Sequence, residues 1–427
     1  MTTERKVPEG RLGRIRRLAG LGARTGASLL LNRDAGARAA AQAAEVLGTM
    51  RGLAAKVGQM ASYIDGMVPD SHRDAYQTAL RGLRAAAPTS SPQQIRRVVE
   101  EELAGPIAAR FAEWEDTPLA SASIGQVHRA RLLDGRQVAV KVQHPGIAGA
   151  IASDLQNAGM IQGLVSMLGP QNLNSQAVFA EVKQRFEEEL DYTLEAERQT
   201  YFRGLHAGDP LIEIPEVFPA CSSRRVLTTT LATGTSLEEA ATAPPAARRQ
   251  HAETLWRFVF KGNLIGRMFN ADPHPGNYLF QPDGRIVFLD FGCVQPIGGE
   301  HLQQSRAAHK AALRGDEAAF TAAITRLLGT SGGAYERVML TYLRRCFEPL
   351  FGAPFQITVP YVKSLVDAIV DMKRLLIKKD SGFVPPQEGL VFMNRLQFGF
   401  YSVLARLDVE ADYAAVEHRF FAEAGLA

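Results

Sequence analysis

Residues 270–277 read NADPHPGN, and residues 290–292 read DFG. In phosphoryl transfer, an aspartate orients or deprotonates the attacking hydroxyl or water, while an asparagine and a second aspartate hold the Mg²⁺ that bridges the phosphates. Asp272, Asn277 and Asp290 stand in that order and at that spacing. The two prolines and the glycine between Asp272 and Asn277 favour a fixed, non-helical loop. The stretch therefore predicts a site for ATP and Mg²⁺, with Asp272 as a catalytic residue and Asn277 and Asp290 as metal ligands.

A lysine upstream fits the same chemistry. Residues 138–141 read VAVK, so Lys141 ends a strand-like run, and its ammonium could hold the α- and β-phosphates of a nucleotide. Taken alone, Lys141 would be a surface lysine on an alternating strand. The loop at 270–277 favours the nucleotide-binding interpretation, because the two motifs follow one another in the expected order.

Strand-like and helix-like stretches divide the chain into parts. Two strand-like runs flank Asp134-Gly135, which is a strong hairpin signal, and a second hairpin is predicted around Asp283-Gly284. A further strand is predicted over 225–231. Apolar residues at helical spacing predict helices over much of the remainder: 39–64, 93–103, 176–205, 240–270 and most of the chain beyond the second hairpin.

This order predicts an α+β, bilobal fold of the protein-kinase type, with a small antiparallel-sheet N-lobe and a helical C-lobe. We expect four segments along the chain: a basic tail over 1–33, an N-terminal helical extension over 34–106, the N-lobe over 107–232 and the C-lobe over 233–427.

Acidic residues on the predicted helix 176–205 are candidates to pair with Lys141. On one continuous helix, Asp191 and Glu195 share a face, whereas Glu189 lies about 120° round from Glu195 at roughly 100° per residue. Two acidic faces indicate two different partners.

Four motifs together resemble the UbiB family, also called AarF-like or atypical coenzyme-Q-biosynthesis kinases. The motifs are KVGQ at 56–59, PLASASIGQVH at 118–128, ELDYTLEA at 189–196 and NADPHPGN at 270–277. The resemblance covers roughly residues 45–300 closely and the C-terminal part more loosely. It implies a protein-kinase-like fold with an added N-terminal helical element that carries the KxGQ motif.

The resemblance also implies roles for particular residues. Lys141 and Glu195 would pair at the nucleotide, and Lys56 would pair with Glu189, so that the KxGQ helix lies where a protein substrate sits in an ordinary kinase. Gln59 belongs to the KxGQ motif and Asp191 to the ExD motif, and the resemblance implies that these two motifs act together as a regulatory pair. The nucleotide would be contacted by an alanine-rich loop and by residues of the hinge: Ala120, Ser121, Ala122, Ser123, Thr229 and Leu231.

This chain departs from the family pattern at a few positions. Asn270 stands where the family usually has histidine, Thr229-Thr230 where Met-Glu is common, and Ser121 interrupts the alanines. Alanine in place of glycine restricts how closely backbone amides approach the phosphates, so nucleotide handling is expected to differ from that of ordinary kinases.

The positive charge of the chain is concentrated at its N-terminus. Residues 1–33 carry eight basic side chains against two glutamates, a net charge of +6, whereas the whole chain carries +3. Leu12, Ile15 and Leu18 recur among the arginines, a pattern that could lay a short helix on an anionic membrane surface. A solvated tail is the alternative interpretation.

Other features of the sequence limit the expected cellular location and partners of the protein. The three cysteines share no CxxC spacing, which favours a reducing compartment and argues against a zinc site. No apolar region follows the basic stretch, which argues against a secretory signal. Polar residues interrupt the uncharged stretch 155–180, so we expect a packed helix there rather than a membrane span. We therefore expect a cytoplasmic protein with at most peripheral membrane contact. Basic residues interleaved with aromatics are not found beyond the tail, which excludes a nucleic-acid partner.

The leading hypothesis is therefore a Mg-dependent ATPase or atypical kinase of the UbiB type, which supports isoprenoid quinone or membrane-lipid metabolism by implication of the resemblance. Its partners would be a nucleotide, an anionic membrane surface and lipid- or quinone-pathway proteins. Two alternatives remain: a kinase for a small hydroxylated metabolite, and a nucleotide-binding, pseudokinase-like scaffold.

Overall fold

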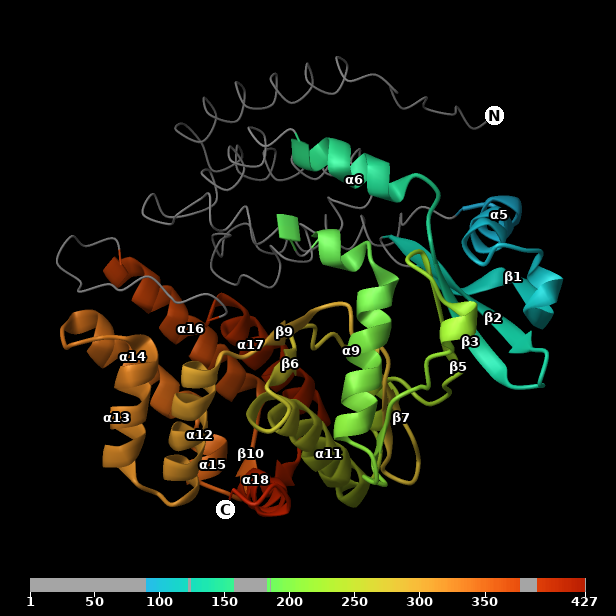
Figure 1. Cartoon of the computed structure of the whole chain (residues 1–427). Coiled ribbons are helices and arrows are strands. Elements are labelled where there is room, and N and C mark those ends of the chain that lie inside the picture. Colours follow the sequence, from blue (N-terminus) through green and yellow to red (C-terminus); the bar gives the residue numbers. More distant parts are fainter. Residues whose placement is uncertain (1–89, 122–123, 157–182, 185, 377–389, 427) are drawn as a thin grey trace, which may run out of the picture. The chain divides into compact units, whose positions relative to one another are not determined.

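The computed structural model describes residues 90–121, 124–156, 183–184, 186–376 and 390–426 of the chain. Contacts between Cα atoms divide the chain into two compact units, whose elements are labelled in Figure 1. Unit 1 contains residues 1–136, 140–190 and 223–226, and unit 2 contains residues 137–139, 191–222 and 227–427. The four segments expected from the sequence stay a prediction.

A four-stranded sheet contains strands β1 and β2 of unit 1 and strands β3 and β5, each of which has residues in both units. β1 (Phe111–Ser121) pairs antiparallel with β2 (Gly125–Leu132), and the four-stranded sheet has the order β1-β2-β3-β5, with β3 spanning Gln137–Gln143 and β5 spanning Val226–Thr230. Between β2 and β3, Gly135 takes φ 91°, a left-handed conformation that glycine adopts without a Cβ clash. The hairpin predicted at Asp134-Gly135 and the strand predicted at 225–231 are confirmed.

Helix α5 (Pro92–Glu102) begins at a capping box. The Ser91 side chain accepts the backbone N–H of Gln94, and the Gln94 side chain accepts the backbone N–H of Ser91. Its apolar residues Ile95, Val98 and Val99 are buried. The helix predicted over 93–103 is confirmed; η2 (Ile107–Ala109) follows α5, and α6 (Ile147–Gln156) follows β3.

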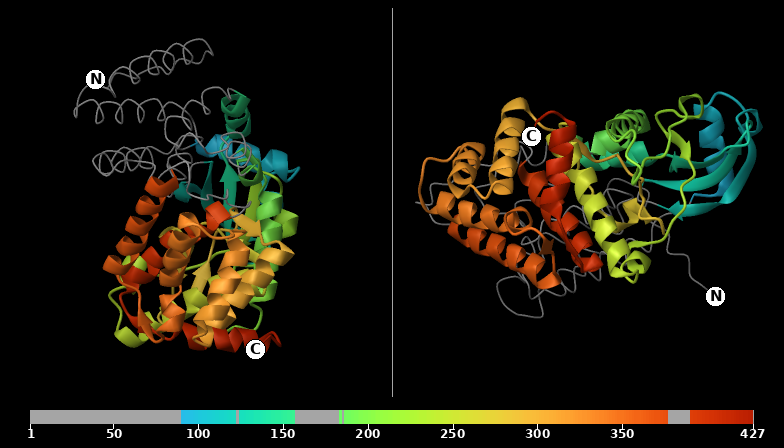
Figure 2. Two further views of the ribbon diagram at one scale, coloured as in Figure 1. Left: turned by 90° about the vertical axis from the view of Figure 1, so that its left-hand side faces the viewer. Right: turned by 90° about the horizontal axis from the view of Figure 1, so that it is seen from below.

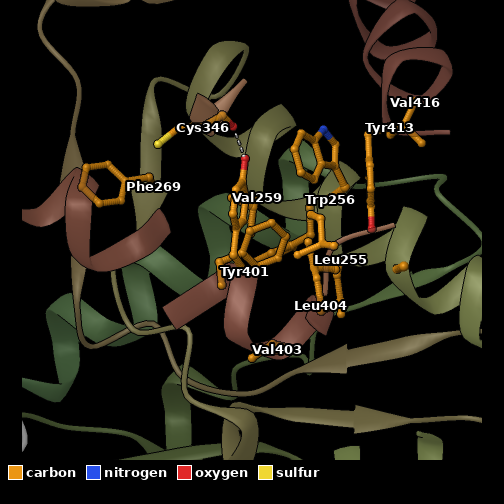
Figure 3. Close-up of a cluster of buried hydrophobic side chains, with 14 of the residues drawn as sticks. Leu255, Trp256, Val259, Phe269, Cys346, Tyr401, Val403, Leu404, Tyr413 and Val416 are labelled. Atoms are coloured by element: carbon orange, nitrogen blue, oxygen red, sulfur yellow. Dashed lines mark hydrogen bonds between the residues drawn. The ribbon is translucent and has the colours of Figure 1, made fainter. Parts of the chain in front are cut away.

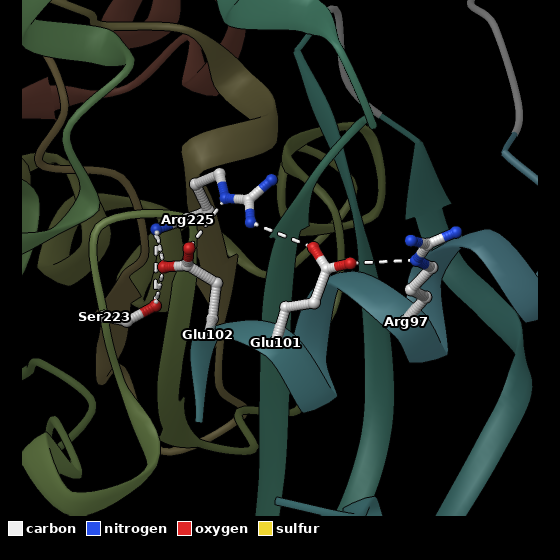
Figure 4. A network of polar contacts seen from close by, with 5 residues as sticks. All are labelled: Arg97, Glu101, Glu102, Ser223 and Arg225. Carbon is white, nitrogen blue, oxygen red and sulfur yellow. Dashed lines mark hydrogen bonds and ion pairs between the residues drawn. The ribbon is translucent and has the colours of Figure 1, made fainter. Parts of the chain in front are cut away.

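The end of α5 is bonded to the start of β5 within unit 1, as Figure 4 shows. Glu102 Oε1 accepts from Arg225 Nε at 2.7 Å, and Glu102 Oε2 accepts from Ser223 Oγ at 2.6 Å. Glu101 links Arg225 to Arg97, at 3.4 and 2.8 Å. Burial raises the pKa of Glu102, but the hydrogen bonds from Ser223 and Arg225 outweigh burial and lower that pKa overall.

Two polar residues of the motif at 118–128 are buried in unit 1. The ring of His128 lies 2.9 Å by its Nδ1 from the carbonyl oxygen of Glu115, so Nδ1 carries the proton, and Nε2 accepts from the Gln126 amide at 2.8 Å. Gln126 Oε1 in turn accepts the backbone N–H of Ser90 at 3.1 Å. Burial lowers the pKa of His128, which keeps the ring neutral. Gln126 and His128 therefore join the sheet to the segment before α5.

Unit 2 contains short strands beside long helices. β7 (Tyr278–Phe280) pairs antiparallel with β8 (Ile286–Phe288), which pairs parallel with β4 (Ile212–Glu213), and β6 (Met268–Asn270) pairs antiparallel with β9 (Val294–Pro296). The predicted hairpin around Asp283-Gly284 is confirmed, and Gly284 takes φ 87° there. The remaining elements before β9 are α9 (Tyr192–Leu205), η3 (Pro219–Cys221), α10 (Leu237–Ala240), α11 (Pro245–Leu264) and η4 (Pro275–Asn277).

After β9 the chain is mostly helical, as predicted, and these helices appear in orange and red in Figure 2. The helices are α12 (Gly299–Leu313), α13 (Glu317–Leu328), α14 (Ala334–Cys346), α15 (Glu348–Phe351), α16 (Val359–Leu376), α17 (Leu390–Leu407) and α18 (Tyr413–Glu423). Two short strands, β10 (Phe355–Gln356) and β11 (Glu410–Ala411), form an antiparallel pair that the sequence did not predict.

The core of unit 2 gathers around Trp256 of α11 (Figure 3). The Trp256 ring lies 4.3 Å from the ring of Tyr413 in α18 and 6.0 Å from that of Tyr401 in α17, between ring centroids. Tyr401 donates its hydroxyl to the carbonyl oxygen of Cys346 at 2.7 Å, and the Trp256 indole donates to Glu417 Oε1 at 2.9 Å. These ring contacts and hydrogen bonds connect α11 to α17 and α18 in unit 2.

The prediction of one continuous helix over 176–205 is wrong. Among the described residues, the helical turn that includes Glu189 ends before Asp191, which has extended φ and ψ of −123° and 92°. The Asp191 side chain accepts the backbone N–H of Thr193 at 3.0 Å, so Asp191 is the N-cap of a new helix, α9. The angular argument that separated Glu189 from Glu195 on one helix therefore does not apply.

Candidate functional site

The loop that follows β6 carries the predicted catalytic residue. Asp272 is half-buried between the buried residues Ala271 and Pro273. Pro275 starts the single 3₁₀ turn η4, and His274 Nδ1 accepts the backbone N–H of Gly276 at 3.0 Å. Apart from that turn, the loop is non-helical as predicted, because its prolines cannot donate backbone hydrogen bonds.

Asn277 is bonded to Asp272 across this loop. The Asn277 Nδ2 lies 3.1 Å from both the backbone oxygen and the Oδ2 of Asp272, and it donates to both. This leaves Asn277 Oδ1 as the oxygen with which the side chain could hold a cation.

The segment of Asp290 lies against the same loop. Leu289 donates its backbone N–H to the Asn277 carbonyl oxygen at 3.0 Å, and Asn270 Nδ2 donates to the backbone oxygen of Asp290 at 2.6 Å. Asp290 Oδ1 accepts the backbone N–H of Gly292 at 2.9 Å. The fold of unit 2 thus brings Asp272, Asn277 and Asp290 together, although they are separated in the sequence.

Helix α9 places two charged residues beside Asp290. Glu195 is 4% exposed, and a Cβ added at Gly292 would lie 3.7 Å from Glu195 Oε2 and 3.2 Å from Asp290 Oδ1. Arg198, one turn further along α9, donates from Nη1 to the Gly292 carbonyl oxygen at 2.9 Å. The absence of a side chain at Gly292 lets the two carboxylates approach one backbone segment.

Phe291, between Asp290 and Gly292, is fully buried. Its ring centroid lies 5.2 Å from that of Phe202 in α9 and 6.3 Å from that of Phe258 in α11. Phe258 stacks on Phe288 of β8 at 3.6 Å. Aromatic contacts therefore connect α9, α11 and the residues around Asp290 inside unit 2.

The other predicted nucleotide contacts lie elsewhere in the two units. Lys141 is half-buried on β3 between Val140 and Val142, which are fully buried, and it belongs to unit 1, whereas Glu195 belongs to unit 2. Their pairing stays a prediction. The remaining positions are at the end of β1 and in or just after β5: Ala120, Ser121, Thr229 and Leu231.

Several predicted residues lie outside the described residues: Lys56, Gln59, Ala122 and Ser123. The predicted contact of Lys56 with Glu189 therefore stays a prediction. Asp191, the fourth member of that regulatory set, caps α9 as described above.

The donors in unit 2 fit a magnesium ion. In the part of the chain that the structure describes, no group of three or more His, Cys, Asp or Glu side chains forms a metal cluster. Mg²⁺ bound with a nucleotide needs only one or two protein carboxylates or amides, because phosphates and waters complete its octahedron. Asp290 and Asn277 could supply such a pair, and their binding of Mg²⁺ stays a prediction.

Sequence reasoning did not predict three features of this site. They are the two hydrogen bonds of Asn270, the hydrogen bond from Arg198 to Gly292, and the close approach of Gly399 in α17 to the loop. A Cβ added at Gly399 would lie 2.5 Å from Pro273 Cγ, so α17 approaches the loop closely. A lone glycine in a helical pattern carries no signal for a contact so distant in sequence. Asn270 was noted in the sequence only as a departure from the family pattern, which did not predict its hydrogen bonds.

Comparison with known proteins adds a family. The profile of the ABC1 atypical kinase-like domain matches residues 82–324. The mitochondrial atypical kinase COQ8B of Rattus norvegicus is 31% identical over 332 residues, which are 73% of this chain and 62% of the relative. The mitochondrial atypical kinase COQ8 of Saccharomyces cerevisiae is 31% identical over 260 residues, which are 60% of this chain and 51% of the relative. The chain therefore aligns with only part of the length of these relatives.

A solved structure is similar over most of its length. The complex of Rv3197 with erythromycin, from Mycobacterium tuberculosis, has a TM-score of 0.62 and 28% sequence identity, and the match covers 88% of this chain and 93% of that chain. Among the helices that the structure describes, none is long and apolar enough to cross a lipid bilayer.

Proposed function

Because the chain belongs to the ABC1 atypical kinase-like family, the UbiB or AarF group of atypical kinases, we propose that it binds ATP with Mg²⁺ and either hydrolyses the ATP or transfers its terminal phosphoryl group. One observation carries the proposal. Asn277 Nδ2 bonds to Asp272 Oδ2 at 3.1 Å, and the backbone of Leu289 and Asp290 is bonded to the same loop, so the three predicted site residues lie on segments that are bonded to one another.

Each residue has a separate task in this proposal. Asp272 orients the acceptor hydroxyl or water, or removes its proton. Asn277 Oδ1 and the Asp290 carboxylate would hold Mg²⁺, whose charge would offset that of the phosphates. Lys141 would contact the phosphates, with Glu195 as the partner that the resemblance implies, and the backbone near Ala120 and Thr229 would contact the nucleotide.

The wider role is proposed from the relatives. The rat and yeast proteins carry the name of atypical kinases COQ8, and both are described as mitochondrial. From these names and the motif resemblance we propose a role in isoprenoid quinone or related membrane-lipid metabolism, with peripheral contact with an anionic membrane surface. The proposed cytoplasmic location rests on the sequence alone and differs from the mitochondrial location of these relatives.

The central test changes Asp290. In Asp290→Asn, one formal charge is lost from the metal ligands, so we expect the affinity for Mg·ATP to fall at least about tenfold. Thermal-shift titration with Mg·ATP, and Mg-dependent release of ADP, measure this. The matched control is Asp283→Asn, which makes the same chemical change at an exposed aspartate of the β7–β8 turn that bonds to Arg285. An Asp290→Asn protein that responds to Mg·ATP as the wild type does contradicts the proposal.

ADP release measured with and without anionic vesicles and phenolic head-group analogues tests the proposed lipid role. Faster ADP release with either addition supports that role. An unchanged rate of ADP release with both contradicts the lipid role and supports only the ATPase activity.

A second candidate is phosphorylation of a small hydroxylated molecule. It is favoured by the similar fold of the Mycobacterium tuberculosis protein, which is bound to erythromycin, a compound with several hydroxyl groups. Mass spectrometry of erythromycin after incubation with the protein and Mg·ATP tests this candidate, since a transferred phosphoryl group adds mass to the acceptor. If Mg·ATP binds but neither ADP nor a phosphorylated acceptor forms, the scaffold alternative is favoured.

A further inference from the structure

Asn270, the last residue of β6, forms hydrogen bonds with both functional segments of unit 2. Its Nδ2 donates to the backbone oxygen of Asp290 at 2.6 Å, and its Oδ1 accepts the backbone N–H of Asp272 at 3.0 Å. We propose that Asn270 is a positioning residue, which fixes the catalytic Asp272 relative to the metal-binding Asp290 through the donor and acceptor of one amide group. The inference rests on the proposed use of Mg·ATP.

The place of Asn270 in the strand pairing explains why one side chain can do this. Asn270 pairs with Val294 at the end of the β6–β9 register, and the next backbone bond runs from the Ala271 N–H to the Cys293 oxygen at 2.7 Å. Beyond it, the two segments leave the ladder, one as the loop 271–277 and the other as the residues around Asp290. The Asn270 amide reaches the backbone of both segments where the ladder ends.

An amide suits this position because neither of its hydrogen-bonding groups titrates. Alanine offers no donor and no acceptor. A histidine could replace the acceptor, since in the same loop His274 Nδ1 accepts the backbone N–H of Gly276, two residues further along, at 3.0 Å. A histidine at 270 can offer one ring nitrogen as an acceptor for the Asp272 N–H and the other as a donor.

Other contacts hold the two segments when the Asn270 amide is removed. Arg198 Nη1 still donates to the Gly292 oxygen, and Asn277 Nδ2 still donates to Asp272 Oδ2. Asn270→Ala should therefore fold and keep the ligands of the cation, while the spacing between Asp272 and Asp290 becomes less well fixed.

The test compares the full-length wild type with Asn270→Ala and Asn270→His, and the control is Gln303→His. The control changes an amide to an imidazole at an exposed position of α12 in the same unit. Mg-dependent ADP release gives kcat and KM from pH 5.5 to 8.5, and each value is divided by that of the wild type at the same pH.

We expect Asn270→Ala to lower kcat by about tenfold or more at every pH, with a smaller change in KM, because geometry rather than binding is lost. Asn270→His, in which one ring nitrogen can replace the lost acceptor, should lower kcat less than Asn270→Ala does. The ratio for Gln303→His should stay constant.

Hydrogen exchange without nucleotide separates this inference from the proposed function. Asn270→Ala should speed exchange of the Asp272 amide, which loses its acceptor, whether or not the wild type releases ADP. A wild type that releases no ADP overturns the proposed function. Unchanged exchange in Asn270→Ala overturns the positioning role, as does an unchanged kcat for Asn270→Ala in an active enzyme. If Asn270→Ala does not fold, Asn270→Leu, which keeps the shape of the side chain and has no hydrogen-bonding group, is measured in its place.

Discussion

His206, at the C-terminal end of α9, is a buried histidine with an unusual environment. Neither ring nitrogen has a hydrogen-bond partner among the described residues, and the ring packs against those of Phe202 and Phe258, at centroid distances of 6.4 and 5.1 Å. Burial, followed by the charge of Lys261, lowers the pKa of His206 to about 3. The ring is therefore neutral and apolar in its contacts at physiological pH.

We predict that His206→Phe stabilises the protein, because phenylalanine keeps the stacking and removes two buried polar atoms without partners. The gain should be roughly 1–2 kcal/mol at pH 7.5. Between about pH 6.5 and pH 3, His206 is protonated in the unfolded chain but neutral in the folded protein. The free energy of unfolding of the wild type therefore decreases as the pH falls through this range, and the advantage of the variant grows.

Thermal unfolding from pH 5 to 8 measures this difference in Tm. His418→Gln, at an exposed histidine of α18, is the control and should show no widening gap. An advantage of His206→Phe that is the same at all pH values would mean that the pKa of His206 is not lowered, and a loss of stability would mean that its nitrogens have partners.

At the scale of elements, α17 sets the position of the catalytic loop. Gly399 lies against Pro273, and Pro273 is adjacent to Asp272. A Cβ at 2.5 Å from a ring carbon is closer than atoms can approach, and a proline ring in a buried loop cannot rotate away. The helix and the loop must therefore separate if position 399 carries a side chain.

We predict that Gly399→Ala lowers the turnover of ATP by about ten- to a hundredfold, because displacements of about 1 Å at catalytic groups have effects of that size. The overpacking should cost only about 1–3 kcal/mol, so the protein still folds. Gly298→Ala is the control, since no atom lies within 4 Å of a Cβ added there. ADP release and thermal unfolding measured together test the prediction, and unchanged turnover in Gly399→Ala would show that α17 does not position the loop.

At the scale of the whole molecule, charge is distributed unequally along the chain. The +6 of residues 1–33 stands against a net charge of +3 for the full chain, so the rest of the chain is acidic on balance. This segment lies outside the described residues, and its role is a prediction from the sequence. A basic segment with apolar residues among its arginines suits an anionic lipid surface.

We predict that full-length protein co-sediments with vesicles that contain anionic lipid and that binding weakens in high salt. Each basic residue near the surface contributes about 1 kcal/mol, and salt screens this attraction. A variant with Arg11, Arg14, Arg16 and Arg17 changed to glutamine keeps the apolar residues and should bind far less. Equal binding by the two proteins, or binding that salt does not change, contradicts the tether.

Much of the fold follows from local chemistry. The capping box of α5 and the Asp-Gly turns at 134–135 and 283–284 are satisfied by residues within a few positions, so the sequence predicts them reliably. The spacing of Asp272, Asn277 and Asp290 likewise predicts one site, because each residue type has a defined task in phosphoryl transfer.

Tertiary structure decided the features that depend on distant parts of the chain. The break before α9 is different, since its N-cap is a local bond from the Thr193 N–H to Asp191, which the apolar spacing that predicted one long helix did not reveal. The contact of Gly399 with Pro273, the burial of His206 and the two bonds of Asn270 arise only when separate segments pack together. The sequence by itself determined which residues could carry out the chemistry, since that depends on residue type and spacing, whereas only packing decided which side chains hold them in place, because contact depends on distance in space.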